Sequence, residues 1–104
     1  MDRVTPGTIE DFIDAFGDKA AEVTAIVADY LDAGTLFLAN LSIDHPARWK
    51  TDGRYIWSGA AAASVRSGDA VVEVEFARHV LENRDKPPVV LNDEMIAAAM
   101  FALP

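Results

Sequence analysis

The sequence contains no cysteine, and this absence excludes disulfide bonds, thiolate catalysis and cysteine-ligated zinc sites. It also lacks an apolar run of about 18 residues, and its start has no basic segment followed by a long apolar one. We therefore expect neither a membrane span nor a signal peptide, but a cytoplasmic protein without membrane contacts. The length of 104 residues and the ordinary share of apolar side chains predict one compact domain over residues 1–104.

Motifs for cofactors and catalysis are missing as well. The segment "SGAAAASVRSG" (58–68) has two glycines but lacks the lysine of a phosphate-binding loop. The two histidines, His45 and His79, do not have the spacing of a metal-binding pair. We therefore predict no cofactor, no metal ion and no catalytic residue, and we expect a protein that is not an enzyme.

One alternative to a protein without catalysis, the second of two that we consider, is a small enzyme that uses His79. Glu75 precedes His79 by four residues and Glu82 follows it by three, so a helix would place all three side chains on one face. The alternating pattern around Glu75 predicts a strand instead, and a strand followed by a helix would separate these groups.

Basic residues are scarce in the first part of the chain. Residues 1–44 carry nine acidic and two basic side chains, whereas residues 45–104 carry eight acidic and seven basic ones. Lysine and arginine supply most of the affinity for nucleic acid, so direct binding to nucleic acid is not expected. An acidic surface instead attracts a protein partner with a basic surface. We predict that this partner contacts an acidic face formed by Glu10, Asp11, Asp14, Asp18, Glu22, Asp29 and Asp32.

Two amphipathic helices, at residues 9–16 and from residue 18 to 32 or 33, would carry this acidic face. Thr8 is a suitable N-cap for the first helix, and Gly17 ends it. Asp18 is the expected N-cap of the second helix, and Gly34 supplies its C-terminal turn. Apolar residues recur at helical spacing in both segments, so we expect a helical hairpin with one apolar and one acidic side.

The middle of the chain predicts a small antiparallel sheet. The dipeptide Asp52-Gly53 lies between two segments with aromatic residues, which is a strong hairpin signal. The apolar run at residues 35–43 suits a buried strand or a short packed helix, and we slightly favour the helix. Ser58 is a suitable cap for a short helix ending near Gly68, although a long strand through the same alanines is the alternative.

Residues 72–76 alternate between apolar and acidic side chains, which predicts a strand with one solvated face. The polar residues that follow, up to Pro87-Pro88, indicate a helical turn or a loop.

The predicted hairpin combines aromatic with basic residues, as interaction hot spots often do. We predict a second partner surface at Arg48, Trp49, Arg54, Tyr55 and Trp57. The alternative is that the aromatic side chains only supply packing area in the core.

A last helix is expected after Asn92, which can cap it, with Asp93 and Glu94 in its first turn. The run "MIAAAMFAL" (95–103) leaves this helix without a polar face. Either the chain itself encloses the helix, or one side of it contacts a second copy or a partner. We favour the second and predict a homodimer interface at Met95, Ile96, Ala99, Met100, Phe101 and Leu103.

These features together predict an α+β fold with an N-terminal acidic helical hairpin, a small antiparallel β-sheet in the middle and an apolar C-terminal helix. We interpret the protein as a small acidic interaction module without catalysis. An inhibitor, an immunity protein or a phage-encoded blocking factor that acts on a basic or nucleic-acid-binding partner would fit this description. The first alternative is a structural subunit of a larger, virion-like assembly.

Overall fold

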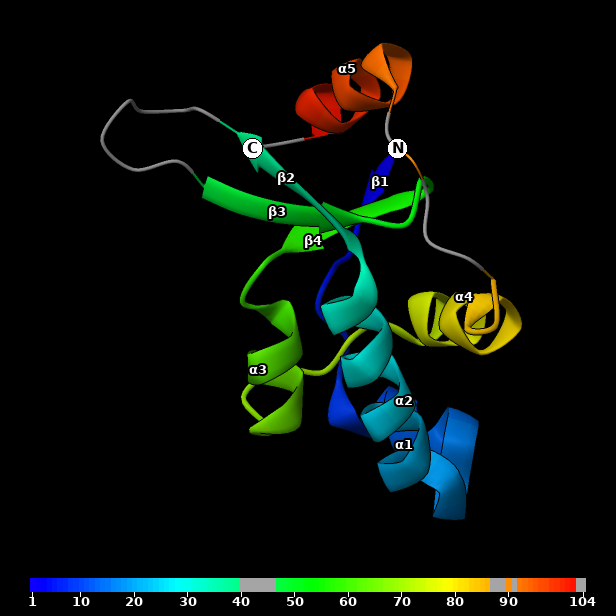
Figure 1. The fold of residues 1–104 in the computed structure, drawn as a ribbon. Helices are drawn as coiled ribbons and strands as arrows, with labels where there is room; N and C mark the ends of the chain where they lie inside the picture. The colour runs from blue at the N-terminus through cyan, green and yellow to red at the C-terminus, as the bar shows by residue number, and fades with distance from the viewer. Residues whose placement is uncertain (40–46, 87–89, 91, 103–104) are drawn as a thin grey trace.

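The computed structural model describes residues 1–39, 47–86, 90 and 92–102. Their fold is α+β, as the sequence predicts: a four-stranded sheet lies between helices α1 to α4 on one side and α5 on the other (Figure 1). The strands are β1 (Asp2–Arg3), β2 (Thr35–Ala39), β3 (Ala47–Thr51) and β4 (Tyr55–Ser58). The helices are α1 (Ile9–Phe16), α2 (Ala20–Ala33), α3 (Ala61–Arg66), α4 (Val74–Asn83) and α5 (Asp93–Ala102), with a 3₁₀ turn, η1, at Gly17–Lys19.

The first helical hairpin has the predicted caps at α1 but not at α2. The Thr8 hydroxyl accepts a hydrogen bond from the Asp11 amide at 3.2 Å, and Gly17 ends α1 with a φ of +52°. The prediction of Asp18 as the next N-cap is wrong, because Asp18 lies inside η1. Lys19 occupies the cap position of α2 and makes no side-chain capping bond.

Gly34 follows the last residue of α2, as the sequence predicts, but its backbone is not left-handed. Its φ of −60° and ψ of 154° are extended and suit any residue. A side chain at this position would overlap the indole ring of Trp57, so close packing explains the glycine.

The sheet has the strand order β1-β4-β3-β2. Strands β3 and β4 form the predicted antiparallel hairpin, and Gly53 has the positive φ, +95°, that the turn requires. Our preference for a helix over residues 35–43 is wrong for the first five of them, because Thr35–Ala39 pairs along β3 as a strand. Residues 40–43 lie outside the described residues. Strand β1, which the sequence did not indicate, runs parallel to β4.

Two segments after the hairpin are helical. Residues 61–66 form the short helix α3, in agreement with one of the two predictions, but the predicted cap Ser58 is wrong, because Ala60 is the N-cap and makes no side-chain capping bond. The prediction of a strand at residues 72–76 is wrong: Val72 makes one isolated bridge to Pro6, and α4 begins at Val74. The reason is that Phe76, Ala77 and Val80 share one buried helical face, whereas the alternation that suggested a strand spans only five residues.

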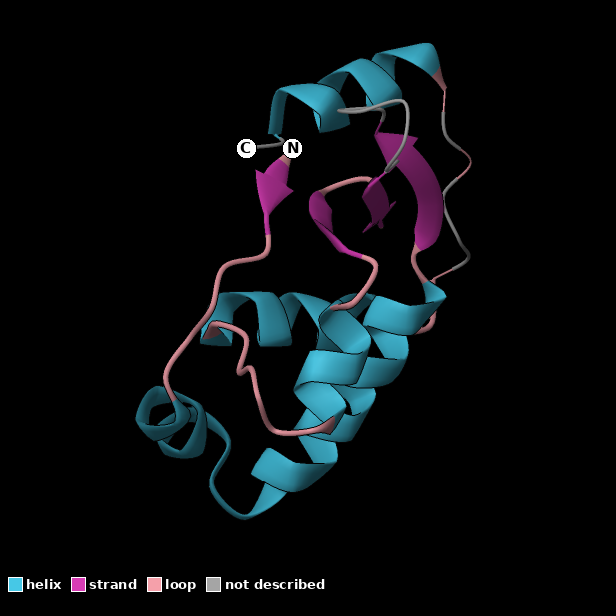
Figure 2. Cartoon of the chain, turned by 90° about the vertical axis from the view of Figure 1, so that its left-hand side faces the viewer, coloured by secondary structure: helices cyan, strands magenta, loops and turns pink. Residues whose placement is uncertain are grey.

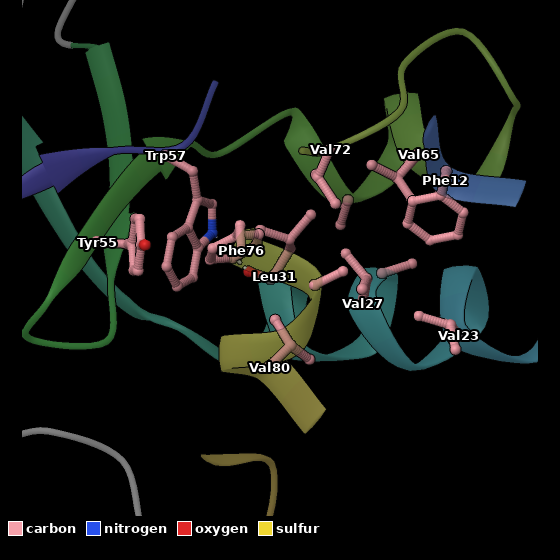
Figure 3. Close-up of a cluster of buried hydrophobic side chains, with 13 residues drawn as sticks. Phe12, Val23, Val27, Leu31, Tyr55, Trp57, Val65, Val72, Phe76 and Val80 are labelled. Atoms are coloured by element: carbon pink, nitrogen blue, oxygen red, sulfur yellow. Dashed lines mark hydrogen bonds between the residues drawn. The ribbon is translucent and has the colours of Figure 1, made fainter. Parts of the chain in front are cut away.

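The main core lies between the sheet and helices α1 to α4 (Figure 3). Phe76, Val27 and Val80 are fully enclosed. The indole nitrogen of Trp57 donates to the carbonyl of Leu31 at 2.9 Å, which ties β4 to the end of α2.

Helix α5 covers the opposite face of the sheet, as Figure 2 shows from the side. Its predicted cap is confirmed, since the side-chain oxygen of Asn92 accepts from the Met95 amide at 2.8 Å. Ala99 is its one buried residue among those described, and it packs with Ile56, Trp49 and Met1 in a small second cluster.

Candidate functional site

A hydrogen-bonded network joins three elements that are far apart in the sequence. Both the hydroxyl of Tyr30 on α2 and Nε2 of His79 on α4 contact Oδ2 of Asp52, in the turn between β3 and β4, at 2.5 and 2.6 Å. Only 16% of the His79 side chain and 12% of the Asp52 side chain are exposed. The network therefore connects the two helices to the hairpin in a largely desolvated place.

Asp52 is the centre of the network. Its other oxygen, Oδ1, accepts from the amides of Arg54 at 3.0 Å and Tyr55 at 2.7 Å. Burial alone would raise the pKa of Asp52, but the hydrogen bonds from Tyr30, the Tyr55 amide, His79 and the Arg54 amide outweigh it and hold the pKa below its ordinary value. Asp52 is thus a carboxylate with both oxygens occupied.

Tyr30 has the opposite shift. Burial raises its pKa well above the ordinary value, and the hydrogen bond to the negatively charged Asp52 raises the pKa further. The phenol therefore keeps its proton and acts as a hydrogen-bond donor to Asp52.

Both ring nitrogens of His79 have partners. Nε2 contacts Asp52, while Nδ1 lies 3.2 Å from the side-chain nitrogen of Asn83, which also donates to the His79 carbonyl at 2.7 Å. In the tautomer that satisfies these contacts, Nε2 carries the proton and Nδ1 accepts from Asn83. Through these contacts the network links α2, the β3–β4 turn and α4.

The alternative of an enzyme that uses His79 with Glu75 or Glu82 would need a contact between His79 and one of these glutamates, and no such hydrogen bond is found among the described residues. Because α4 is a helix, all three residues do border one hollow of about 450 Å³. The described hydrogen bonds of His79 nevertheless go to Asp52 and Asn83 and not to either glutamate. His45, the other histidine, lies outside the described residues.

A cleft of about 370 Å³ opens beside the network, between the end of α2, the β3–β4 turn and the end of α4. Tyr30, Ala33 and Trp57 supply an apolar part of its wall, and Asp52 and His79 also line it. Three cationic residues also line the cleft: Arg54, Arg84 and Lys86. Its volume falls in the range of small-molecule sites, roughly 300–1,000 Å³.

The predicted acidic face divides into two parts. Asp29 and Asp32 form ion pairs with Arg66, at 2.9 and 3.3 Å, and Asp32 also lies 3.7 Å from the ammonium of Lys50. These two carboxylates are the reason that the pKa of Arg66 lies above its ordinary value. The remaining five acids are exposed and form no ion pair with any described residue: Glu10, Asp11, Asp14, Asp18 and Glu22.

The predicted aromatic partner surface is mostly inside the molecule. Tyr55 and Trp57 belong to the main core and are 4% and 3% exposed, so they cannot contact a partner in this fold. Trp49 is partly buried against α5, with its indole nitrogen enclosed and without a hydrogen-bond partner. Arg48 and Arg54 are exposed. The alternative that these aromatic side chains supply packing area describes Tyr55 and Trp57 correctly.

The predicted oligomer interface on α5 is divided between buried and exposed positions. Ala99 faces the sheet and Met95 is partly covered, whereas Ile96, Met100 and Phe101 are 40%, 43% and 92% exposed. Leu103 lies outside the described residues. The described residues therefore leave one side of this helix exposed.

No pattern in the sequence marks the central residues of the network. The sequence predicts Asp52 only as a turn residue, and the helical pattern of residues 18–33 gives Tyr30 no polar role. The three partners are 22 and 27 positions apart, so no local spacing could indicate them.

A comparison of the chain with protein-family models, with curated proteins and with solved structures gives no significant match. Within the described residues, no cluster of three or more candidate ligands could hold a metal ion. The same residues include no helix with the length and apolarity needed to cross a bilayer.

Proposed function

We propose that the protein is a non-enzymatic interaction module whose first helical hairpin binds a partner protein with a basic surface. The observation that carries this proposal is the group of five exposed acids on α1, η1 and the start of α2, which pair with no cation in the described chain. Like charges this close repel one another, and a basic partner would relieve that repulsion on binding. The charge would also accelerate encounter with such a partner.

Apolar side chains lie among these acids. Ile9 and Ile13 on α1 are 52% and 50% exposed, while Phe12 on the same helix is buried. An interface that combines exposed isoleucine with carboxylates offers both contact area and charge selectivity. A partner that uses its basic surface for nucleic acid would be blocked by this contact. We therefore favour an inhibitor, an immunity protein or a phage-encoded blocking factor that acts in the cytoplasm without binding nucleic acid or membrane itself.

We also propose that α5 mediates self-association into a homodimer. Ile96, Met100 and Phe101 are apolar side chains on α5 that the described residues leave exposed. In a structural subunit of a larger assembly, the same surface would join unlike neighbours instead. Light scattering of the purified protein separates these cases, because a closed dimer gives one mass and open assembly gives a mass that grows with concentration.

The partner surface is tested in two steps. A photo-crosslinking residue at Ile13 captures the partner, and association rates of the captured protein are then measured with purified variants at low and high salt. The variant E10Q/D11N/D14N/D18N removes four acids from the proposed face. We expect it to slow association about tenfold or more at low salt, with less effect at high salt, because screening weakens steering.

The matched control is E75Q/E82Q/D85N/E94Q. It changes the net charge by the same amount at four exposed positions outside the helical hairpin of α1 and α2. It should slow association much less. Equal rates for the two variants would show that only total charge matters and would remove the proposed face.

A further inference from the structure

We propose that the cleft between α2, the β3–β4 turn and the end of α4 binds a small organic anion through a carboxylate or phosphate group. This site is separate from the partner surface on α1 and does not depend on it. The inference begins from the charges around the cleft: Arg54, Arg84 and Lys86 border it, against the single carboxylate of Asp52.

This local excess of positive charge is exceptional in a protein with a net charge of −8. The chain has nine lysines and arginines in all, so a third of them surround one concavity. None of the three forms an ion pair with a described residue, whereas Lys50 and Arg66 are both paired. A cleft walled by protein concentrates the field of its charges, so an anion would be drawn to this point of the surface.

Asp52 does not cancel this attraction. Its two oxygens accept four hydrogen bonds from Tyr30, His79 and two backbone amides, and it is 12% exposed. These donors disperse its charge within the network. The negative head of a ligand would therefore lie toward Arg84 and Lys86 and away from Asp52.

The apolar wall indicates what the rest of the ligand is. Tyr30, Ala33 and Gly34 line the cleft at the end of α2, and the Trp57 ring, which is only 3% exposed, backs this wall at a centroid distance of 6.0 Å from the Tyr30 ring. The Trp57 ring is held by its hydrogen bond to Leu31, so this wall is preformed. A flat, apolar body of about one or two rings would cover it, and the volume of about 370 Å³ suits a small molecule and not a macromolecule.

The test uses the complete chain and four probes: phenyl phosphate, benzoate, inorganic phosphate and the neutral benzyl alcohol. Amide chemical shifts are followed by NMR during each titration. We expect one or both aromatic anions to shift the signals of Gly34, Gly53 and Arg84 at millimolar concentration, with weaker binding in high salt. The stronger of the two identifies the preferred head group, and benzyl alcohol should cause no comparable shift.

The double variant R84S/K86S should reduce the affinity for the better anion about tenfold, because two cationic partners are lost. The control R3S/K19S makes the same change in net charge at exposed positions outside the cleft and should leave the affinity unchanged. An equal loss in both variants, or no shift with either aromatic anion, would overturn the proposal. Inorganic phosphate binding as well as phenyl phosphate would overturn the assignment of the apolar wall.

Discussion

The two faces of the sheet differ in how completely they are covered. On one face, Tyr55 and Trp57 of β4 belong to the core that α1 to α4 cover. On the other face, Ile56 of the same strand is covered by α5, which is itself half exposed. The strand is therefore buried on both faces, but by layers of unequal thickness.

This difference separates two roles of apolar residues. The large side chains of the thick layer are almost fully buried within the chain itself. The thin layer shields Ile56 and leaves Ile96, Met100 and Phe101 in water, which is typical of a surface that another molecule covers. Substitutions in the two layers should accordingly have different consequences.

The largest effect is expected from Phe76→Ala in the thick layer. Phe76 is fully enclosed and its ring contacts those of Tyr55 and Trp57, at centroid distances of 5.0 and 5.9 Å. Its truncation should lower the free energy of unfolding by about 3–5 kcal/mol, because it leaves a cavity between the sheet and the helices. Urea denaturation measures the change. A loss below about 1 kcal/mol would mean that this core is far looser than its burial indicates.

The next effect concerns Asp52, at the margin of the thick layer. Asp52→Ala leaves the hydroxyl of Tyr30, Nε2 of His79 and two amides without their acceptor. We expect a loss of about 2–3 kcal/mol in the free energy of unfolding near neutral pH. Tyr30→Phe, which removes one of these bonds and leaves Asp52 its other donors, should cost less in the same urea titration.

The same residue predicts a dependence on pH. Because the folded protein holds the pKa of Asp52 below its ordinary value of 3.8, the charged carboxylate stabilises the fold above that value. This stabilisation is lost as the pH falls through the folded pKa. The difference in unfolding free energy between the wild type and Asp52→Asn should therefore shrink in acid. If the difference in unfolding free energy between the two proteins stays constant from neutral pH to below pH 3.8, the lowered pKa of Asp52 is wrong.

A smaller and local effect is expected in the thin layer. Ala99→Asp places a carboxylate against Ile56 and Trp49, which is costly without a partner, so α5 should separate from the sheet. Hydrogen exchange should then lose protection in α5 while α2 and α4 keep theirs. Ala97→Asp, at an exposed position of the same helix, is the matched control and should change little. Equal loss of protection in α4 and α5 would show that the two layers unfold together.

The smallest effect on folding is expected from Phe101→Ser. The Phe101 side chain is 92% exposed, so the free energy of unfolding should change by no more than about 0.5 kcal/mol. The proposed dimer should weaken nonetheless, and light scattering at high protein concentration should report a lower average mass than for the wild type. An unchanged mass would leave the exposed face of α5 without a function.

The sequence predicted the elements whose signals are local. Thr8 and Asn92 mark their helices through hydrogen bonds to residues three positions on, and Asp52-Gly53 specifies a turn by its own conformation. Two segments were assigned wrongly because short apolar patterns do not distinguish helix from strand. Pairing with β3 decides Thr35–Ala39, and packing of Phe76 and Val80 decides α4.

The candidate sites were less predictable for the same physical reason. Charge counting indicated the acidic face, but it could not show that Arg66 and Lys50 pair with Asp29 and Asp32 at one end of it. The network around Asp52 depends on three distant segments that meet only in the fold. No pattern within any one of them carries that information.

The parallel pairing of β1 with β4 has a consequence for synthesis. Asp2 lies beside Tyr55 and Arg3 beside Ile56, so residues 2 and 3 can pair only after residues 55 and 56 have been synthesised. Helices α1 and α2 can form before β4 is synthesised, because their contacts are close in sequence. We expect residues 2 and 3 to stay accessible to proteases and chaperones until β4 has left the ribosome, and β1 to join the sheet only after that.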